Sequence, residues 1–230
     1  MTVAFDTELK AYEIPAFRGA VCEKIGYEND VYHNHNNQGG DKLKYYYRYP
    51  KVQYKRYRDR PMLVFVNEGI EAAQHFFGQP SWELTFGGKE HTMKIGNLRV
   101  KEFPLQVKEH FMEYRIFRWQ ALNQRNYEEW QKLDGLLEEV AFLEKKLCGH
   151  IISFASGVDW QMETRFEVKI LEVIRQHVVK FKGVRVTTFD IRFKTNVFIP
   201  EFIGLGKGIS HGYGVVRPVW KKLNLKTDQK

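Results

Sequence analysis

The sequence predicts an α+β fold built from two tandem units, and three observations support this. The chain has 230 residues, of which 43% are hydrophobic, and this suits one large globular domain or two of about 110 residues. Strand-like and helical stretches follow one another in a similar order, β-α-β-β, in both halves. We place the boundary near Pro104 to Glu109, which gives an N-terminal unit at 1–108 and a C-terminal unit at 109–230.

The N-terminal unit begins with a strand and a helix. Apolar residues among polar neighbours over residues 3–13 predict the strand. Pro15 suits the first turn of the helix that follows, and Gly26 can end it. An apolar stripe at i, i+4 and i+8 marks this helix, formed by Phe17, Val21 and Ile25.

A polar stretch follows the helix, and a basic, tyrosine-rich stretch comes next. Residues 28–41 contain many turn formers and almost no apolar side chains, so we predict a loop. Residues 42–60 hold eight basic residues and six of the twelve tyrosines. Pro50 interrupts this stretch and favours an edge strand or a bend, with strands at about 43–49 and 51–57.

The remaining elements of the N-terminal unit are shorter. Leu63–Val66 has the composition of a buried strand, and residues 68–77 predict a short helix closed by Gly78. Alternating apolar residues from Trp82 onward predict strands up to Phe103, with a turn at 87–88 and a kink at 96–97.

The C-terminal unit repeats the pattern. Residues 111–122 predict a strand, and Asn126 with Glu129 predicts the start of a helix. Apolar residues at helical spacing continue to Leu147, and a further short helical stretch covers 151–154. Residues 166–182 and 184–197 predict a hairpin around Gly183, and 213–219 a last strand. Two such units are typical of a duplicated ferredoxin-like (RRM-like) architecture.

Composition restricts the partner and the compartment. The net charge of +8 and a pI near 9.3 indicate an anionic partner, either nucleic acid or a membrane surface. An aromatic content of 15% favours nucleic acid, because rings stack on bases. Cys22 and Cys148 form no metal motif, and neither a signal peptide nor a membrane span is indicated. We therefore expect a cytoplasmic protein without cofactor or metal.

A glycine-rich loop near the end of the chain is the sharpest motif. Residues 204–214 follow the pattern G-h-G-x-x-x-x-x-G-h-G, where h is hydrophobic. Backbone N–H groups in such a turn can form an anion-binding concavity, although a long hairpin turn is the alternative. No G-x-x-x-x-G-K-[ST] phosphate motif is present. The predicted phosphate-binding residues are Gly204, Gly206, Lys207, Ser210, His211, Gly212 and Gly214.

This loop resembles the glycine-rich loop of the repeat-associated (RAMP) superfamily of CRISPR systems. Three further features are similar to the endoribonucleases of that superfamily that cut precursor CRISPR RNA: Phe17-Arg18-Gly19 on the first helix, a histidine-bearing polar loop, and the run 48–55. The resemblance covers nearly the whole chain. It implies two ferredoxin-like domains side by side, CRISPR repeat RNA as the partner, and Arg18 as an RNA-binding residue.

RNA carries its own nucleophile, so cleavage needs a base, an acid and positive charge rather than a metal. Imidazole suits both proton roles because its pKa lies near the operating pH. His33 and His35 are the best candidates, with their division into acid and base left open. We expect Lys42, or alternatively Lys44, to stabilise the phosphorane and Tyr47, or alternatively Tyr32, to position the ribose. The alternatives for this H-x-H are a solvated turn or half of a metal site.

The basic stretch supplies the remaining predicted RNA contacts. They are Lys44, Lys51, Lys55, Arg56 and Arg58, and the alternative is a solvated edge strand. Two other functions fit the same composition: a non-catalytic RNA-binding RAMP-type subunit, and a polyanion or membrane-surface binder. Other CRISPR-associated proteins are possible partners, and a monomer and a homodimer fit equally well.

Overall fold

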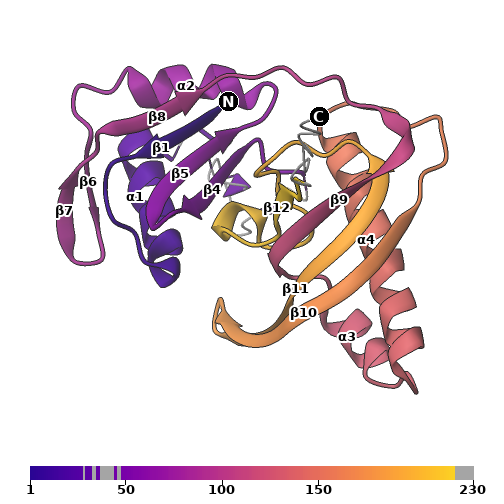
Figure 1. The fold of residues 1–230 in the computed structure, drawn as a ribbon. Coiled ribbons are helices and arrows are strands. Elements are labelled where there is room, and N and C mark those ends of the chain that lie inside the picture. The colour runs from indigo at the N-terminus through magenta and orange to yellow at the C-terminus, as the bar shows by residue number, and fades with distance from the viewer. Residues whose placement is uncertain (28, 33–34, 37–43, 46–47, 221–230) are drawn as a thin grey trace, which may run out of the picture.

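A computed structural model describes residues 1–27, 29–32, 35–36, 44–45 and 48–220 (Figure 1). Two four-stranded antiparallel sheets lie next to each other, one from each half of the chain. The helices lie behind both sheets in Figure 1, so each sheet has one helix-covered face and one helix-free face. The last part of the chain runs between the two sheets.

The N-terminal sheet has the ferredoxin-like strand order β4-β5-β1-β8. Helix α1 connects β1 to β4 and helix α2 follows β5, so the predicted strand-helix-strand-strand order is confirmed. The elements are β1 (Thr2–Phe5), α1 (Ile14–Ile25), β4 (Val52–Tyr57), β5 (Arg60–Phe65), α2 (Gly69–Phe77) and β8 (Ile95–Arg99).

Three smaller features complete this unit. The first strand ends at Phe5, earlier than predicted, and a 3₁₀ turn (Ala11–Glu13) leads into α1. A hairpin of β6 (Glu83–Phe86) and β7 (Lys89–Thr92) packs on α1. Within the polar stretch, the described residues form a short ladder of β2 (His35–Asn36) and β3 (Lys44–Tyr45).

The C-terminal sheet repeats this arrangement with the order β10-β11-β9-β12. Its strands are β9 (Val107–Trp119), β10 (Val168–Phe181), β11 (Val184–Val197) and β12 (Val215–Pro218). The hairpin predicted around Gly183 is confirmed, with Phe181 paired to Val184. Helix α4 packs on this sheet, chiefly along β10.

The helical segment of the C-terminal unit differs from the prediction. The residue that caps the first helix is Asn123, whose side chain accepts a 2.7 Å hydrogen bond from the backbone N–H of Asn126. Helix α3 (Gln124–Trp130) ends before Gly135, whose φ of 127° interrupts the helical backbone. Helix α4 (Leu136–Gly157) then continues through the stretch predicted as a separate short helix.

The glycine-rich loop stands where the fold repeat calls for a second helix. In the N-terminal unit, α2 connects the third strand of the unit to the fourth. In the C-terminal unit the corresponding connection, between β11 and β12, contains a single 3₁₀ turn, η2 (Ile209–His211). With no helix at this point, the loop contacts β4 of the N-terminal sheet instead.

The two units share a hydrophobic core, because β5 is buried on both faces. Leu63 and Phe65 pack with the helices of the N-terminal unit, whereas Met62 and Val64 pack with residues such as Ile203 of the C-terminal unit. Successive side chains of a strand point to opposite faces, so one strand serves both cores. In the described part of the chain, no helix is long and apolar enough to cross a membrane.

Candidate functional site

The segment that carries the predicted catalytic histidines is described only in part. His33, Lys42 and Tyr47 lie outside the described residues. The backbones of His35 and Lys44 belong to the short β2–β3 ladder, in which His35 pairs with Tyr45. The site is therefore defined by the residues at which this segment begins and ends.

The segment begins at a buried tyrosine. Tyr32 is 1% exposed, and its hydroxyl donates a 2.5 Å hydrogen bond to the carbonyl of Ala72 in α2. The hydroxyl of Tyr54 in turn donates to the Tyr32 carbonyl, at 3.2 Å. Tyr32 is thus a core residue that fixes where the segment leaves α1, and the alternative that it positions a ribose is wrong.

The segment ends at a second buried tyrosine, which is joined to the glycine-rich loop. The hydroxyl of Tyr49 donates a 2.8 Å hydrogen bond to the carbonyl of Gly204. The side chain of Gln53, fully buried, donates to the Tyr49 oxygen at 3.1 Å and accepts from the N–H of Gly204 at 3.0 Å. Both backbone groups of Gly204 are thereby bound by the stretch that follows the histidine segment.

Tyr49 also contacts the C-terminal end of α4. A Cβ placed on Gly157 would lie 2.2 Å from the Cβ of Tyr49, and the Tyr49 ring lies 5.6 Å from that of Phe154. Only a glycine allows this approach. Burial raises the pKa of the Tyr49 hydroxyl, so it is a neutral hydrogen-bond donor. Tyr49 therefore joins the N-terminal unit, α4 and the glycine-rich loop at one point.

The glycines of the loop are required by packing against protein. Gly214 has a φ of 65°, and a Cβ there would lie 1.8 Å from the carbonyl oxygen of Leu205. A Cβ on Gly206 would lie 2.8 Å from the ring of Trp119. Gly204, Gly212 and Gly214 are buried, so the prediction that these three contact a phosphate backbone is corrected: their surroundings are protein.

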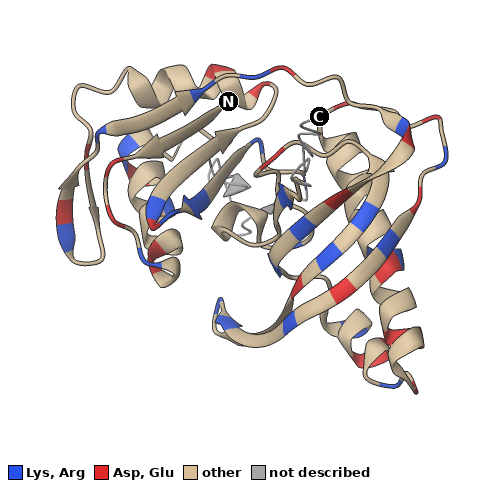
Figure 2. Ribbon diagram, viewed as in Figure 1, with Lys and Arg blue, Asp and Glu red and all other residues tan. Residues whose placement is uncertain are grey.

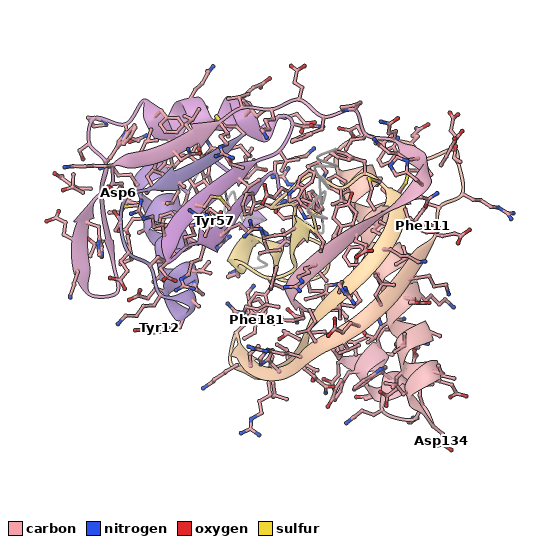
Figure 3. The ribbon with its side chains drawn as sticks, in the orientation of Figure 1. Asp6, Tyr12, Tyr57, Phe111, Asp134 and Phe181 are labelled. Carbon is pink, nitrogen blue, oxygen red and sulfur yellow. The ribbon has the colours of Figure 1, made fainter. Side chains whose placement is uncertain are left out.

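The exposed part of the loop carries its polar side chains. Lys207 is exposed, and its N–H donates a 3.1 Å hydrogen bond to the carbonyl of Gln120. The hydroxyl of Ser210 lies 3.2 Å from Nδ1 of His211, and the His211 ring meets the ring of Phe181 edge-on at 5.3 Å. Figure 3 shows Phe181 at the end of the β10–β11 hairpin, below this loop. Ser210 and His211 are half-buried, so all three polar side chains keep some exposed surface.

Lys55 does not belong to an RNA-facing surface, contrary to the prediction. Its side chain is fully buried between β4 and the glycine-rich loop, where the ammonium lies 3.4 Å from the carbonyl of Ile209. Burial lowers the pKa of Lys55 to about 7. The alternation that places Arg56 at the surface turns Lys55 inward, and the sequence contains no sign of which of the two faces is covered.

The other predicted basic contacts are more accessible, and each has a protein partner. Lys51 forms a 2.6 Å ion pair with Glu68. Arg56 donates from Nε to the carbonyl of Leu9 at 2.6 Å and pairs with Asp59. Arg58 is exposed at the β4–β5 turn, with its guanidinium 5.3 Å from the centre of the Tyr57 ring.

Arg18 is half-buried on α1. Its guanidinium lies 5.8 Å from the centre of the Tyr54 ring, and its Nε is buried with no hydrogen-bond partner among the described residues. Tyr54 is the residue whose hydroxyl holds the carbonyl of Tyr32. Arg18 therefore lies near the start of the histidine segment, through packing on this tyrosine.

His150 of α4 helps to position the ring of Trp119, a contact that the sequence pattern does not predict. Its Nδ1 accepts a 3.1 Å hydrogen bond from Nε1 of Trp119, the ring against which Gly206 packs. Burial, followed by the nearby charges of Lys207 and Lys146, lowers its pKa to about 4. A neutral imidazole therefore supports the floor of the glycine-rich loop. Helical spacing alone places His150 on α4 but says nothing of this contact.

A groove lies between the N-terminal unit, at the start of α1 and the β4–β5 turn, and the C-terminal sheet. It has a volume of about 450 Å³ and extends from the β4–β5 turn to β9 and β12. Figure 3 shows Tyr57 at this junction, and Figure 2 shows basic positions on the strands to both sides of it. Four arginines and three aromatic residues line it: Arg56, Tyr57, Arg58, Phe117, Arg118, Phe202 and Arg217. Arginines with aromatic rings are typical of a nucleic-acid contact surface.

Metal ligands do not gather in the described part of the chain. Residues 1–27, 29–32, 35–36, 44–45 and 48–220 contain no group of three or more His, Cys, Asp or Glu side chains placed to hold an ion. Cys22 is buried and Cys148 half-buried, and burial raises the pKa of both thiols.

Comparison with known proteins identifies the family. Residues 1–104 match the Cas6b N-terminal domain, and residues 106–219 match the Cas6b C-terminal domain. The chain therefore belongs to the Cas6b family.

A relative in sequence and two solved structures are similar to this chain. An uncharacterized protein of Methanocaldococcus jannaschii, MJ0978, is 35% identical over 137 residues, which are 58% of this chain and 90% of that protein. A crystal structure of Cas6b superposes with a TM-score of 0.83 at 23% identity, over 95% of this chain and all of that one. A structure described as CRISPR RNA processing endoribonuclease Cas6b has a TM-score of 0.64 at 22% identity, with the same coverage. The predicted tandem ferredoxin-like fold is thus confirmed.

Proposed function

We propose that this chain binds CRISPR repeat RNA and cleaves precursor CRISPR RNA without a metal ion. In this reaction the 2′-oxygen of the ribose attacks the adjacent phosphorus while a base removes its proton. The new P–O2′ bond replaces the P–O5′ bond, and an acid delivers a proton to the leaving 5′-oxygen. The products are a 2′,3′-cyclic phosphate and a 5′-OH end, so atoms and charge balance without a cofactor.

The residues proposed for these steps are those of the polar segment. One of His33 and His35 removes the proton of the 2′-OH, and the other delivers a proton to the leaving 5′-oxygen. Lys42 stabilises the negative charge of the phosphorane, and Tyr47 positions the ribose. Lys207, Ser210 and His211 contribute RNA contacts from the glycine-rich loop. Each well-placed proton transfer contributes about 10²–10⁴ in rate.

One observation carries the proposal: the hydrogen bonds by which Tyr49 and Gln53 hold both backbone groups of Gly204. They tie the end of the histidine segment to the start of the glycine-rich loop, although the two are about 155 residues apart in sequence. This link supports the proposal that one RNA strand contacts both the loop and the histidine segment. Membership of the Cas6b family supports the same reaction class.

The test compares wild-type protein with the double variant His33→Ala/His35→Ala on repeat RNA in EDTA. Wild type is expected to cut and the variant to bind without cutting. A 2′-deoxy substitution at the cleaved nucleotide is expected to stop the reaction, and the 5′ product is expected to carry a cyclic phosphate by mass spectrometry. Equal cutting by both proteins overturns the histidine assignment.

Other outcomes point to other functions. Tight binding of repeat RNA by wild type with no cleavage identifies a non-catalytic RNA-binding subunit of a CRISPR ribonucleoprotein. Cleavage that EDTA abolishes and added Mg²⁺ restores contradicts the metal-independent mechanism. Size-exclusion chromatography with light scattering on the same samples distinguishes the monomer from the homodimer.

A further inference from the structure

Three arginines form a row across the helix-free face of the C-terminal sheet. In the strand register Arg192 of β11 pairs with Arg115 of β9, and Arg115 pairs with Arg217 of β12. The residues on either side of Arg115, Tyr114 and Ile116, are buried in the core. Because side chains alternate along a strand, all three guanidinium groups extend from the opposite, helix-free face.

Such a row is unfavourable unless something neutralises it, because like charges directly opposite on neighbouring strands repel. The two outer arginines have carboxylate partners: Arg217 lies 3.0 Å from Glu201, and Nε of Arg192 lies 3.3 Å from Glu172. The central one, Arg115, is exposed and makes no ion pair among the described residues. The row thus retains a positive charge at its middle.

The carboxylates nearest to this row have other contacts. Asp190 accepts a 2.7 Å hydrogen bond from the N–H of Arg118 and lies 3.7 Å from Nε2 of His177. Glu113 stands opposite Lys194 in the register, one position beyond the row on the same face. These carboxylates therefore have partners of their own, and none of the ion pairs among the described residues includes Arg115.

The row leads into the groove between the two sheets. The guanidinium of Arg217 lies 4.8 Å from the centre of the Tyr57 ring and 5.1 Å from that of Phe202, both of which line the groove. These rings hold the guanidinium at the edge of the groove, where Arg58 and Arg118 also lie. A continuous basic path thus extends from the sheet face to the junction of the two units.

We propose that Arg115, together with Arg192 and Arg217, binds phosphates of the RNA backbone away from the scissile bond. Neighbouring strands lie about 4.8 Å apart, so the row presents evenly spaced guanidinium groups along a line across the sheet. Guanidinium groups bind phosphate in a bidentate manner, and contacts to phosphate carry no sequence information. The row therefore supplies affinity and orientation, independent of sequence. This inference rests on the proposed function, since it concerns a remote contact of the same RNA.

The experiment measures binding and cleavage separately. Binding is measured with 2′-O-methyl repeat RNA, which no 2′-OH attack can cleave, over a range of salt concentrations. For Arg115→Ala we expect the Kd to rise about tenfold and the slope of log K against log salt to fall by about one. Arg115→Lys is expected to keep the slope, because a single phosphate contact survives. Arg125→Ala on α3, where Arg125 is exposed and paired with Glu129, is the matched control and is expected to change neither.

Cleavage of unmodified RNA gives the second readout. At saturating protein, the single-turnover rate of Arg115→Ala is expected to equal that of wild type, because the row does not touch the reacting atoms. If Arg115→Ala has the affinity and the salt slope of wild type, the proposed phosphate-binding role of the row is wrong, whatever the cleavage result. If Arg115→Ala loses affinity but the wild-type protein does not cleave, the phosphate-binding role of the row is supported and only the proposed reaction is wrong. An RNA affinity too weak to measure in wild type overturns both.

Discussion

The hydroxyl of Tyr49 donates a 2.8 Å hydrogen bond to the carbonyl of Gly204, and this joins the two segments that the sequence marks as functional. The histidine segment ends just before Tyr49, and the glycine-rich loop begins at Gly204. The bond is buried, so no water replaces it when it is lost. Four predictions follow from the contacts around this junction and the loop.

Tyr49→Phe removes the donor to Gly204 and the acceptor for the Gln53 side chain, while keeping the ring that packs on Phe154. We expect the free energy of unfolding to fall by about 1–2 kcal/mol, because a buried carbonyl is left unpaired. We also expect slower single-turnover cleavage by the folded variant, since the histidine segment loses its attachment. Tyr12→Phe, at a tyrosine that is 73% exposed, is the control and should leave both quantities unchanged. If Tyr49→Phe has the unfolding free energy and the cleavage rate of wild type, the bond from Tyr49 to Gly204 does not hold the two segments together.

Gly214→Ala is expected to be severely destabilising. Its Cβ would lie 1.8 Å from the backbone oxygen of Leu205, and its φ of 65° is unfavourable for alanine. We expect a loss of about 3 kcal/mol or more in unfolding free energy, the range for strained backbone combined with a steric clash. Gly149→Ala in the exposed middle of α4 is the comparison, since a Cβ there meets nothing within 4 Å. That variant should gain about 0.5–1 kcal/mol. Similar melting temperatures for the two variants contradict the packing role of the loop.

Lys55→Met is expected to stabilise the protein at neutral pH. Burial lowers the folded-state pKa of Lys55 to about 7, below that of an unfolded lysine. The unfolded state therefore binds a proton more strongly, and stability falls as the pH drops from about 10 towards 7. A methionine fills similar volume without the charge, so we expect a gain on the order of 1–3 kcal/mol at pH 7. The measurement is urea unfolding at pH 7 and pH 9.5. Wild type should be more stable at the higher pH, and the variant should lack this part of the difference.

The lowered pKa of His150 predicts that the protein loses stability in acid. Its folded-state pKa of about 4 lies below the ordinary value of 6.5, chiefly because of burial. The unfolded state gains the proton first, so the stability that His150 supplies is complete above pH 6.5 and declines as the pH falls towards 4. The decline is at most ~1.4 kcal/mol for each pH unit. His150→Gln keeps an acceptor for Nε1 of Trp119 and does not titrate, so its unfolding free energy should vary less over this range. If the unfolding free energies of wild type and His150→Gln change in parallel with pH, the loss of stability in acid does not come from His150.

Element order and the main motif could be predicted from the sequence. Apolar periodicity gave the strand-helix-strand-strand order of both halves, and the G-h-G pattern pointed to the RAMP group before any fold was known. Element ends were less accurate, as at Asn123, which caps α3 three residues before the predicted cap. Asparagines occur at both positions, and it is Asn123 that has the extended backbone of an N-cap, with φ −91° and ψ 178°.

The tertiary structure alone decided what each basic or glycine residue faces. Alternation along β4 shows that Lys55 and Arg56 lie on opposite faces, but only the docking of the glycine-rich loop buries the former. The glycines of that loop were expected to lie against a phosphate, and they pack closely against Trp119, Leu205 and β4 instead. The row of Arg192, Arg115 and Arg217 comes from three strands distant in sequence, and the antiparallel register brings them together. Periodicity separates the two sides of an element, whereas the group that covers each side is a property of the assembled fold.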